Sequence, residues 1–178
     1  QDEEYKIRKK LTQKISKYSQ MIKTSCLNIG KLDLLLAKVN LAQKFKGKKP
    51  KIKIKTELYL KNMNNPYIEQ ILKKNDQNFT KLTITLNPGV NIITGANMGG
   101  KTVFMKTLML NALLAQMGFF VFAEKAQIPV FDFYTLISDD MQDINSGLST
   151  FGAEVLALNE IIKKIRKSEG LILFDEFA

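Results

Sequence analysis

The chain lacks several features that would assign it to particular classes of protein. Its 178 residues include a single cysteine, Cys26, so no disulfide can form within the chain, and a lone thiol suits a reducing compartment. No apolar run reaches the roughly 20 residues that a transmembrane helix needs, and no signal peptide is visible. We therefore expect a cytoplasmic protein without a membrane partner.

Acidic residues and arginine are scarce beside lysine. The 27 basic residues outnumber the 17 acidic ones, the net charge is +10, and Arg8 and Arg166 are the only arginines. Lysine can serve as a point charge for phosphate, but bidentate reading of bases favours arginine. The charge leaves two interpretations open, a solvated lysine-rich surface or a surface that contacts a polyanion.

The first part of the chain has the pattern of a helix. Apolar or small residues recur at alternating spacings of four and three, which predicts a long helix that packs along one seam: Leu11, Ile15, Tyr18, Ile22, Ser25, Ile29 and Leu32. Helix-forming residues continue over 33–45, and Gly47 and Pro50 then break the pattern. We expect a helical segment over residues 1–47 and a second domain over 48–178.

The second part has an α/β pattern. Strict alternation predicts a half-buried strand over 51–58, whose lysines form a solvated face or a DNA contact. A strand over 82–86 is expected to pair, through Asn87-Pro88-Gly89, with another over 90–94. Residues 119–122, 130–137 and 171–174 are interpreted as strands, and 103–117 as a buried helix ended by Gly118. A further helix is expected from a Ser149 cap to about Lys167, with these residues facing inward: Phe151, Val155, Leu158, Ile162 and Ile165.

Residues 95–102, Gly-Ala-Asn-Met-Gly-Gly-Lys-Thr, fit the phosphate-loop pattern G-x-x-x-x-G-K-[ST] between an expected strand and an expected helix. Glycines let the backbone curl so that successive N–H groups point at phosphate oxygens. Lys101 would reach the β- and γ-phosphates, and the Thr102 hydroxyl would ligate Mg²⁺. The start of the following helix adds a positive dipole end. The pattern predicts binding of a nucleoside triphosphate with Mg²⁺.

Two carboxylates follow the apolar residues 171–174. On a buried parallel strand they would emerge at the carboxyl end, where open α/β sheets bind ligands. Asp175 would hold Mg²⁺, and Glu176 would polarise the water that attacks the γ-phosphorus. Upstream, Ser146 to Phe151 open the last helix, and either an ordinary capped helix or a second anion site fits them.

These motifs together resemble the MutS family. Residues 94–102 are similar to its loop T-G-x-N-x-G-G-K-[ST], in which Asn97 and Gly99 differ from generic phosphate loops. Ser149-Thr150-Phe151 with Glu154 resembles the family's signature helix, and residues 173–176 resemble its second acidic motif. Residues 63–69 resemble the segment that opens its ATPase domain, and residues 31–33 the end of the preceding core domain.

The resemblance implies an ABC-type ATPase that works as a homodimer with ATP and Mg²⁺. The fold would be a P-loop NTPase with a mixed sheet flanked by helices. Residues binding nucleotide would be Gly95, Asn97, Gly99, Gly100, Lys101 and Thr102, with Lys101 and Glu176 catalytic and Thr102 and Asp175 on the metal. Ser149 would contact the γ-phosphate in trans. Phe79 would either stack on adenine or belong to the core.

The chain also departs from the family pattern. The family usually has His-Pro where this chain has Asn65-Pro66, and the chain has no histidine. It starts at Gln1 and stops at Ala178 directly after a predicted strand, so we expect a piece of a longer protein, truncated after the second acidic motif, that binds nucleotide but hydrolyses it poorly.

Two functions are compatible with the resemblance. One is a mismatch-repair or recombination-control ATPase that contacts DNA through domains outside this chain. The alternative is a MutS-like ATPase that reactivates a protein partner, such as a cobalamin-dependent aminomutase.

Overall fold

The computed structural model describes residues 2–54, 56–96, 99–137 and 150–175, and the chain divides into two compact units, Gln1–Gln43 and Lys44–Ala178. The side chains of 150–154, 156 and 157 lie outside the description. Among the described helices, none combines the length and hydropathy that crossing a membrane requires.

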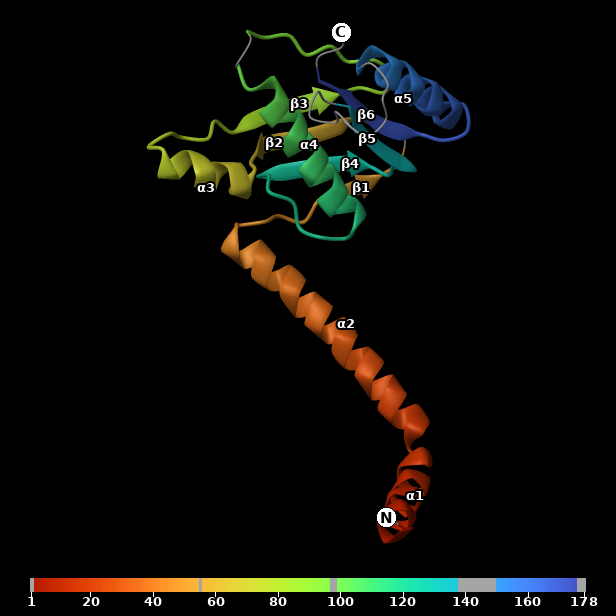
Figure 1. Cartoon of the computed structure of the whole chain (residues 1–178). Coiled ribbons are helices and arrows are strands. Elements are labelled where there is room, and N and C mark those ends of the chain that lie inside the picture. Colours follow the sequence, from red (N-terminus) through yellow and green to blue (C-terminus); the bar gives the residue numbers. More distant parts are fainter. Residues whose placement is uncertain (1, 55, 97–98, 138–149, 176–178) are drawn as a thin grey trace. The chain divides into compact units, whose positions relative to one another are not determined.

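The first unit is made of two helices, α1 (Asp2–Ser16) and α2 (Ser19–Lys44, which ends just inside the second unit) (Figure 1). The single long helix predicted from the stripe is therefore wrong at one point. Between the helices, the Tyr18 N–H donates to the Ile15 carbonyl at 2.9 Å, which closes a three-residue turn. The stripe stays exposed, as Leu11 (52%) and Leu32 (57%) show, so its expected packing is not formed among the described residues.

The second unit contains two sheets. The strands β1 (Lys51–Lys53), β2 (Leu58–Met63), β3 (Leu82–Leu86) and β4 (Lys125–Pro129) form a sheet in the order β1-β4-β2-β3. Strand β4 is parallel to β1, and β2 is antiparallel to both β3 and β4. The strands β5 (Phe133–Ile137) and β6 (Gly170–Phe174) form a separate parallel pair. The architecture is mixed α/β, as predicted.

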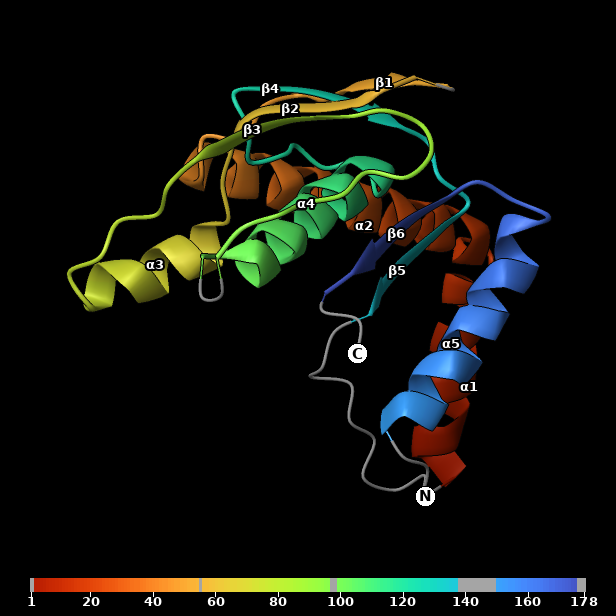
Figure 2. The ribbon, with the colours of Figure 1, turned by 90° about the horizontal axis from the view of Figure 1, so that it is seen from above.

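Helix α4 (Lys101–Gln116) is the centre of the core, and the predicted buried helix is confirmed. It contacts β2 and β5, and it lies between the two sheets, with α5 (Thr150–Ile165) beyond β5 and β6 (Figure 2). Helix α3 (Pro66–Lys74) follows β2 directly. Apolar residues of α4, β2 and β4 are buried, and this set includes Leu58, Leu60, Met63, Phe104, Leu108, Ala112, Ala126 and Ile128.

The strand predicted over 51–58 is two strands, β1 and β2, which are not neighbours. Leu58 is buried (2%), but Ile52 (48%) and Ile54 (80%) are exposed. Only part of the alternating apolar set is therefore buried. The chain leaves the sheet after β1 and returns to it as β2, on the far side of β4.

Residues 90–94 form no strand, although they were expected to pair with 82–86. Strand β3 pairs with β2 instead. Local polar bonds offer the backbone another conformation, since the Asn91 side chain accepts from the Asn87 N–H (3.3 Å) and donates to the Asn87 carbonyl (2.8 Å). Val90 (93%) and Ile92 (85%) are exposed as a result.

The predicted strand over 119–122 is reduced to one bridge, between Val121 and Lys48. The strand predicted over 130–137 ends where β5 ends but begins three residues before it. Strand β4, over Lys125–Pro129, was not predicted. The strands over 82–86 and 171–174 are confirmed.

The helix expected from Ser149 to about Lys167 is confirmed as α5, but its inward face is not. Among the described side chains, Val155 (37%), Ile162 (47%) and Ile165 (52%) are exposed, Leu158 is half-buried, and Ile161 (5%) is buried. Phe151, also expected to face inward, lies outside the described side chains.

Candidate nucleotide-binding site

The glycine-rich loop has a backbone that requires two of its glycines. The Gly99 N–H donates to the Ala96 carbonyl at 2.9 Å, and a Cβ on Gly99 would lie 2.7 Å from that oxygen. Gly100, which directly precedes α4, has φ +87°. Residues with a side chain rarely adopt this backbone conformation. A Cβ on Gly95 would meet only Lys101 Cγ, at 3.8 Å. The tight turn therefore depends on Gly99 and Gly100, whereas the backbone at Gly95 tolerates a side chain.

Lys101 turns back over the loop that precedes it. Its Nζ donates to the carbonyls of Gly95 (3.0 Å) and Ala96 (3.2 Å). The ammonium group is therefore held beside the backbone of Gly95 and Ala96, within the loop motif.

Helix α4 begins at Lys101, and the Phe104 N–H makes an early helical bond, to the Gly100 carbonyl at 2.8 Å. The first N–H groups of an α-helix have no acceptor within the helix and attract anions. Thr102, in this first turn, is half-buried. The arrangement offers backbone donors, a cation and a hydroxyl within one short segment.

Asp175 follows β6 and continues its pairing, because its N–H donates to the Ile137 carbonyl at 2.8 Å. The residue is buried (7%), and within the described part of the chain its carboxylate has no hydrogen-bond or ion-pair partner. Buried charges are normally paired or bound to metal. A carboxylate and a threonine hydroxyl are oxygen donors of the kind that Mg²⁺ prefers, so this donor set fits the ion.

The structure places these two parts on one side of the unit. Helix α4 begins at the side where β6 ends (Figures 1 and 2), and β5, the neighbour of β6, contacts α4. Phe79 lies half-buried in the segment between α3 and β3. The predicted residues Asn97, Ser149 and Glu176 lie outside the described residues.

Asn111 was missed by the sequence reasoning, although it fixes the helix that carries the loop. It is fully buried (0%), and its Oδ1 accepts from the Phe122 N–H at 2.7 Å. Its Nδ2 donates to the carbonyls of Thr107 (2.9 Å) and Asn64 (3.2 Å). A lone asparagine on an apolar helix was the available signal. The side chain joins α4 to the end of β2 and to the segment before β4.

The neighbouring Asn64-Asn65-Pro66 segment begins α3. Asn65 is buried and caps the helix, its Oδ1 accepting from the Ile68 N–H at 3.3 Å, and proline occupies the first turn. The Asn64 Nδ2 donates to Glu69 at 2.6 Å. This bond, and then the one from Lys73, lower the pKa of Glu69. Asn65 thus has a structural role at the position where the family usually has histidine.

Fold and loop together define the class, a mixed α/β protein that carries a phosphate-loop motif at the start of a buried helix. Residues 91–178 match the family model of MutS domain V. The chain is 30% identical over 177 residues to the "DNA mismatch repair protein MutS" of Staphylococcus haemolyticus, covering 99% of this chain and 20% of that protein. The corresponding protein of Lactobacillus delbrueckii subsp. bulgaricus is 31% identical over 177 residues (99% and 21%), and that of Streptococcus uberis 28% over 175 (98% and 20%).

These similarities support the MutS family for this chain and the resemblance seen in its motifs. The chain spans about a fifth of the length of the curated relatives that it matches.

Proposed function

We propose that the chain binds ATP with Mg²⁺ at residues 95–102 and contributes to ATP hydrolysis in a MutS-like protein that acts on DNA in mismatch repair. The observation that supports this most is the loop geometry. Gly99 and Gly100 occupy positions that other residues fill only with strain, and Lys101 Nζ already lies over the loop.

In this proposal the loop binds the phosphates. The backbone of Gly95, Asn97, Gly99 and Gly100 surrounds them, and Lys101 neutralises their charge. Thr102 and Asp175 hold Mg²⁺, which supplies the positive charge that offsets the triphosphate. Glu176 orients the attacking water.

The second half of the site would come from another subunit. The resemblance implies a dimer in which Ser149 contacts the γ-phosphate bound by the partner. Phe79, which is half-buried, would stack on adenine. Nucleotide binding is the part of this proposal that can be measured on this chain alone.

DNA is favoured over a protein partner as the target. The three relatives described above carry "DNA mismatch repair" in their names, and they align with almost the whole of this chain. No observation on the chain favours a cobalamin-dependent enzyme.

The central test is Lys101→Ala. Hydrogen bonds to charged groups contribute about 1.5–3 kcal/mol, so the affinity for Mg-ATP should fall about 10- to 150-fold. Isothermal titration calorimetry measures it. Lys106→Ala, an exposed position further along α4, is the matched control and should bind as the unchanged chain does. Equal affinity of Lys101→Ala and the control would refute the assigned loop.

A pair of glycine substitutions tests the loop geometry itself. Gly99→Ala places its Cβ against the Ala96 carbonyl and should weaken Mg-ATP binding strongly, whereas Gly95→Ala meets only the flexible Lys101 side chain and should weaken it less. The same titration ranks the two variants, and the reverse order would show that nucleotide does not bind this loop conformation.

A further inference from the structure

The four-stranded sheet has one apolar face and one basic face. Side chains alternate between the faces along each strand, and residues paired in register share a face. Leu58 and Leu60 of β2 and Ala126 and Ile128 of β4 are buried on the face that α4 covers. The residues between them point to the other face.

The register shows which residues gather on that other face. Lys51 of β1 and Tyr59 of β2 both pair with Gln127 of β4, and Lys61 pairs with Lys125. With Lys53 and two threonines of β3, they form what we call the lysine face: Lys51, Lys53, Tyr59, Lys61, Thr83, Thr85, Lys125 and Gln127. These side chains are exposed or half-buried.

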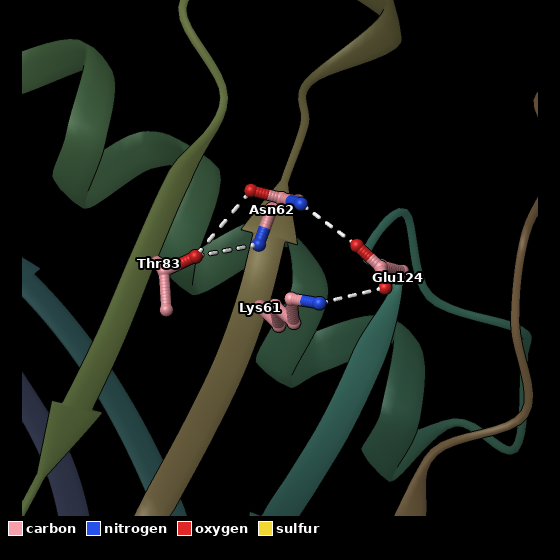
Figure 3. A network of polar contacts seen from close by, with 4 residues as sticks. All are labelled: Lys61, Asn62, Thr83 and Glu124. Atoms are coloured by element: carbon pink, nitrogen blue, oxygen red, sulfur yellow. Dashed lines mark hydrogen bonds and ion pairs between the residues drawn. The ribbon is translucent and has the colours of Figure 1, made fainter.

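A carboxylate forms an ion pair with one lysine of the lysine face. Glu124 accepts from Lys61 Nζ (2.9 Å) and from Asn62 Nδ2 (2.7 Å), and the Asn62 N–H donates to Thr83 Oγ1 at 3.0 Å. Figure 3 shows this network on the side of the sheet away from α4. Asn62 sits at a bulge with φ +50°, which holds it beside Glu124. Glu124 thus forms an ion pair with Lys61, and the nearby charge of Lys125 adds to the lowering of the Glu124 pKa.

The remaining lysines leave an excess of positive charge. Within the described part of the chain, Lys51, Lys53 and Lys125 form no ion pair. The segment leading into β1 adds further exposed lysines, Lys46, Lys48 and Lys49, and residues 44–53 contain no acidic residue. The charge is therefore concentrated over β1, β4 and the segment before β1.

Protection of a sheet edge is the simplest alternative explanation. Lysines on an edge strand prevent pairing with other chains, and this would account for Lys51 and Lys53 on β1. It does not account for Lys125, which lies on β4 and pairs in register with Lys61 of β2. A membrane surface is less suitable as a partner, because the lysine face carries no exposed aliphatic side chain that could insert between lipids.

We infer that the lysine face binds the sugar-phosphate backbone of DNA. The ammonium groups of Lys51, Lys53 and Lys125, on β1 and β4, match a polymer of phosphates, and threonine and glutamine side chains add hydrogen-bond donors to phosphate oxygens. The absence of arginine from the face points to contact without base reading. The inference rests on the proposed function, and it adds a DNA contact within this chain to those expected from other domains.

The test is the salt dependence of DNA binding by a triple variant, Lys51→Gln, Lys53→Gln and Lys125→Gln. Fluorescence anisotropy with a labelled, fully paired duplex measures the affinity of the 178-residue chain at several salt concentrations. Each lost phosphate contact lowers the slope of log affinity against log salt by about 0.9. The unchanged chain should lose more affinity than the variant when the salt is raised from about 50 to about 200 mM. With three phosphate contacts removed from the variant, the loss of the unchanged chain should be about 40-fold larger than that of the variant.

A matched triple variant controls for net charge. Lys74→Gln, Lys81→Gln and Lys167→Gln removes three exposed lysines of the same unit and should retain the slope of the unchanged chain. An equal loss in both variants, or no binding of duplex by the unchanged chain at low salt, would overturn the inference. The inference would also be overturned if the lysine-face variant bound DNA as the unchanged chain does but no longer bound phosphatidylserine vesicles.

Nucleotide binding separates this inference from the proposed function. The lysine-face variant should retain its Mg-ATP affinity, and Lys101→Ala should retain the salt slope for DNA. If the lysine-face variant kept the salt slope of the unchanged chain while Mg-ATP binding was intact, the inference about the lysine face would fail and the proposed nucleotide site would be unaffected.

Discussion

Replacing Asn111 by alanine should destabilise the second unit far more than its size suggests. The side chain is fully buried and makes three hydrogen bonds to backbone groups. The loss of the bond to the Thr107 carbonyl should cost least, because that carbonyl is also an acceptor for the backbone hydrogen bonds of the helix. The buried Phe122 N–H would lose its acceptor, at about 1–3 kcal/mol, and the half-buried Asn64 carbonyl one donor, at about 1 kcal/mol. The expected loss is about 2–4 kcal/mol.

This loss is large beside the total. Domains are stable by about 5–15 kcal/mol, and 1 kcal/mol corresponds to about 2–4 °C in Tm for a chain of this size. Differential scanning calorimetry should show a transition lowered by about 4–16 °C. Calorimetry suits the chain because it can separate a transition of the helical unit from one of the second unit.

An exposed asparagine on a helix provides the control. Asn159 of α5 is exposed, and alanine favours helix over asparagine by up to about 0.7 kcal/mol, so Asn159→Ala should be neutral or slightly stabilising. The two identical substitutions are thus expected to have opposite signs. A Tm for Asn111→Ala within 1–2 °C of that of Asn159→Ala would refute the argument that this side chain joins α4 to the rest of the unit.

Two further predictions concern the same unit. The pKa of Glu69 is lowered by Asn64 and then Lys73, so its ionised form stabilises the fold above its unfolded pKa, and this contribution disappears as the pH falls through the folded pKa. Urea unfolding should therefore show Glu69→Gln less stable than the unchanged chain at pH 7 and equal to it at about pH 2–3; a constant difference would contradict the mechanism. Gly170→Ala would place a Cβ 2.3 Å from the Phe133 ring, so β5–β6 should be destabilised by about 1–3 kcal/mol, and Phe133→Leu in the same chain should recover part of the loss.

The features that sequence reasoning predicted well are local ones. The glycine-rich loop, the helix after it and the strand before Asp175 each follow from a short run of residues. Gly100 at φ +87° is an example, since its conformation is decided by its own lack of a side chain and by the turn around it. The assignments of Lys101, Thr102 and Asp175 to phosphate and metal remain predictions until nucleotide binding is measured.

The errors arose where distant segments compete for the same partners. Residues 90–94 have the composition of a strand, yet β3 pairs with β2, and Asn91 bonds to Asn87. The strand propensity of a segment does not determine which other segment pairs with it. The same explanation applies to β1 and β2. Their residues share one alternating pattern in the sequence, but the two strands are not neighbours in the sheet.

The sequence by itself predicted the candidate site, because the loop motif is one run of residues, 95–102, and Asp175 directly follows an apolar run. It also determined the excess of lysine. Only the tertiary structure decided that Lys51, Lys53 and Lys125 share one face and that Asn111 joins α4 to two other segments. Register and burial are set by pairing between residues far apart in the chain, and a one-residue shift in register would have moved every one of these lysines to the other face.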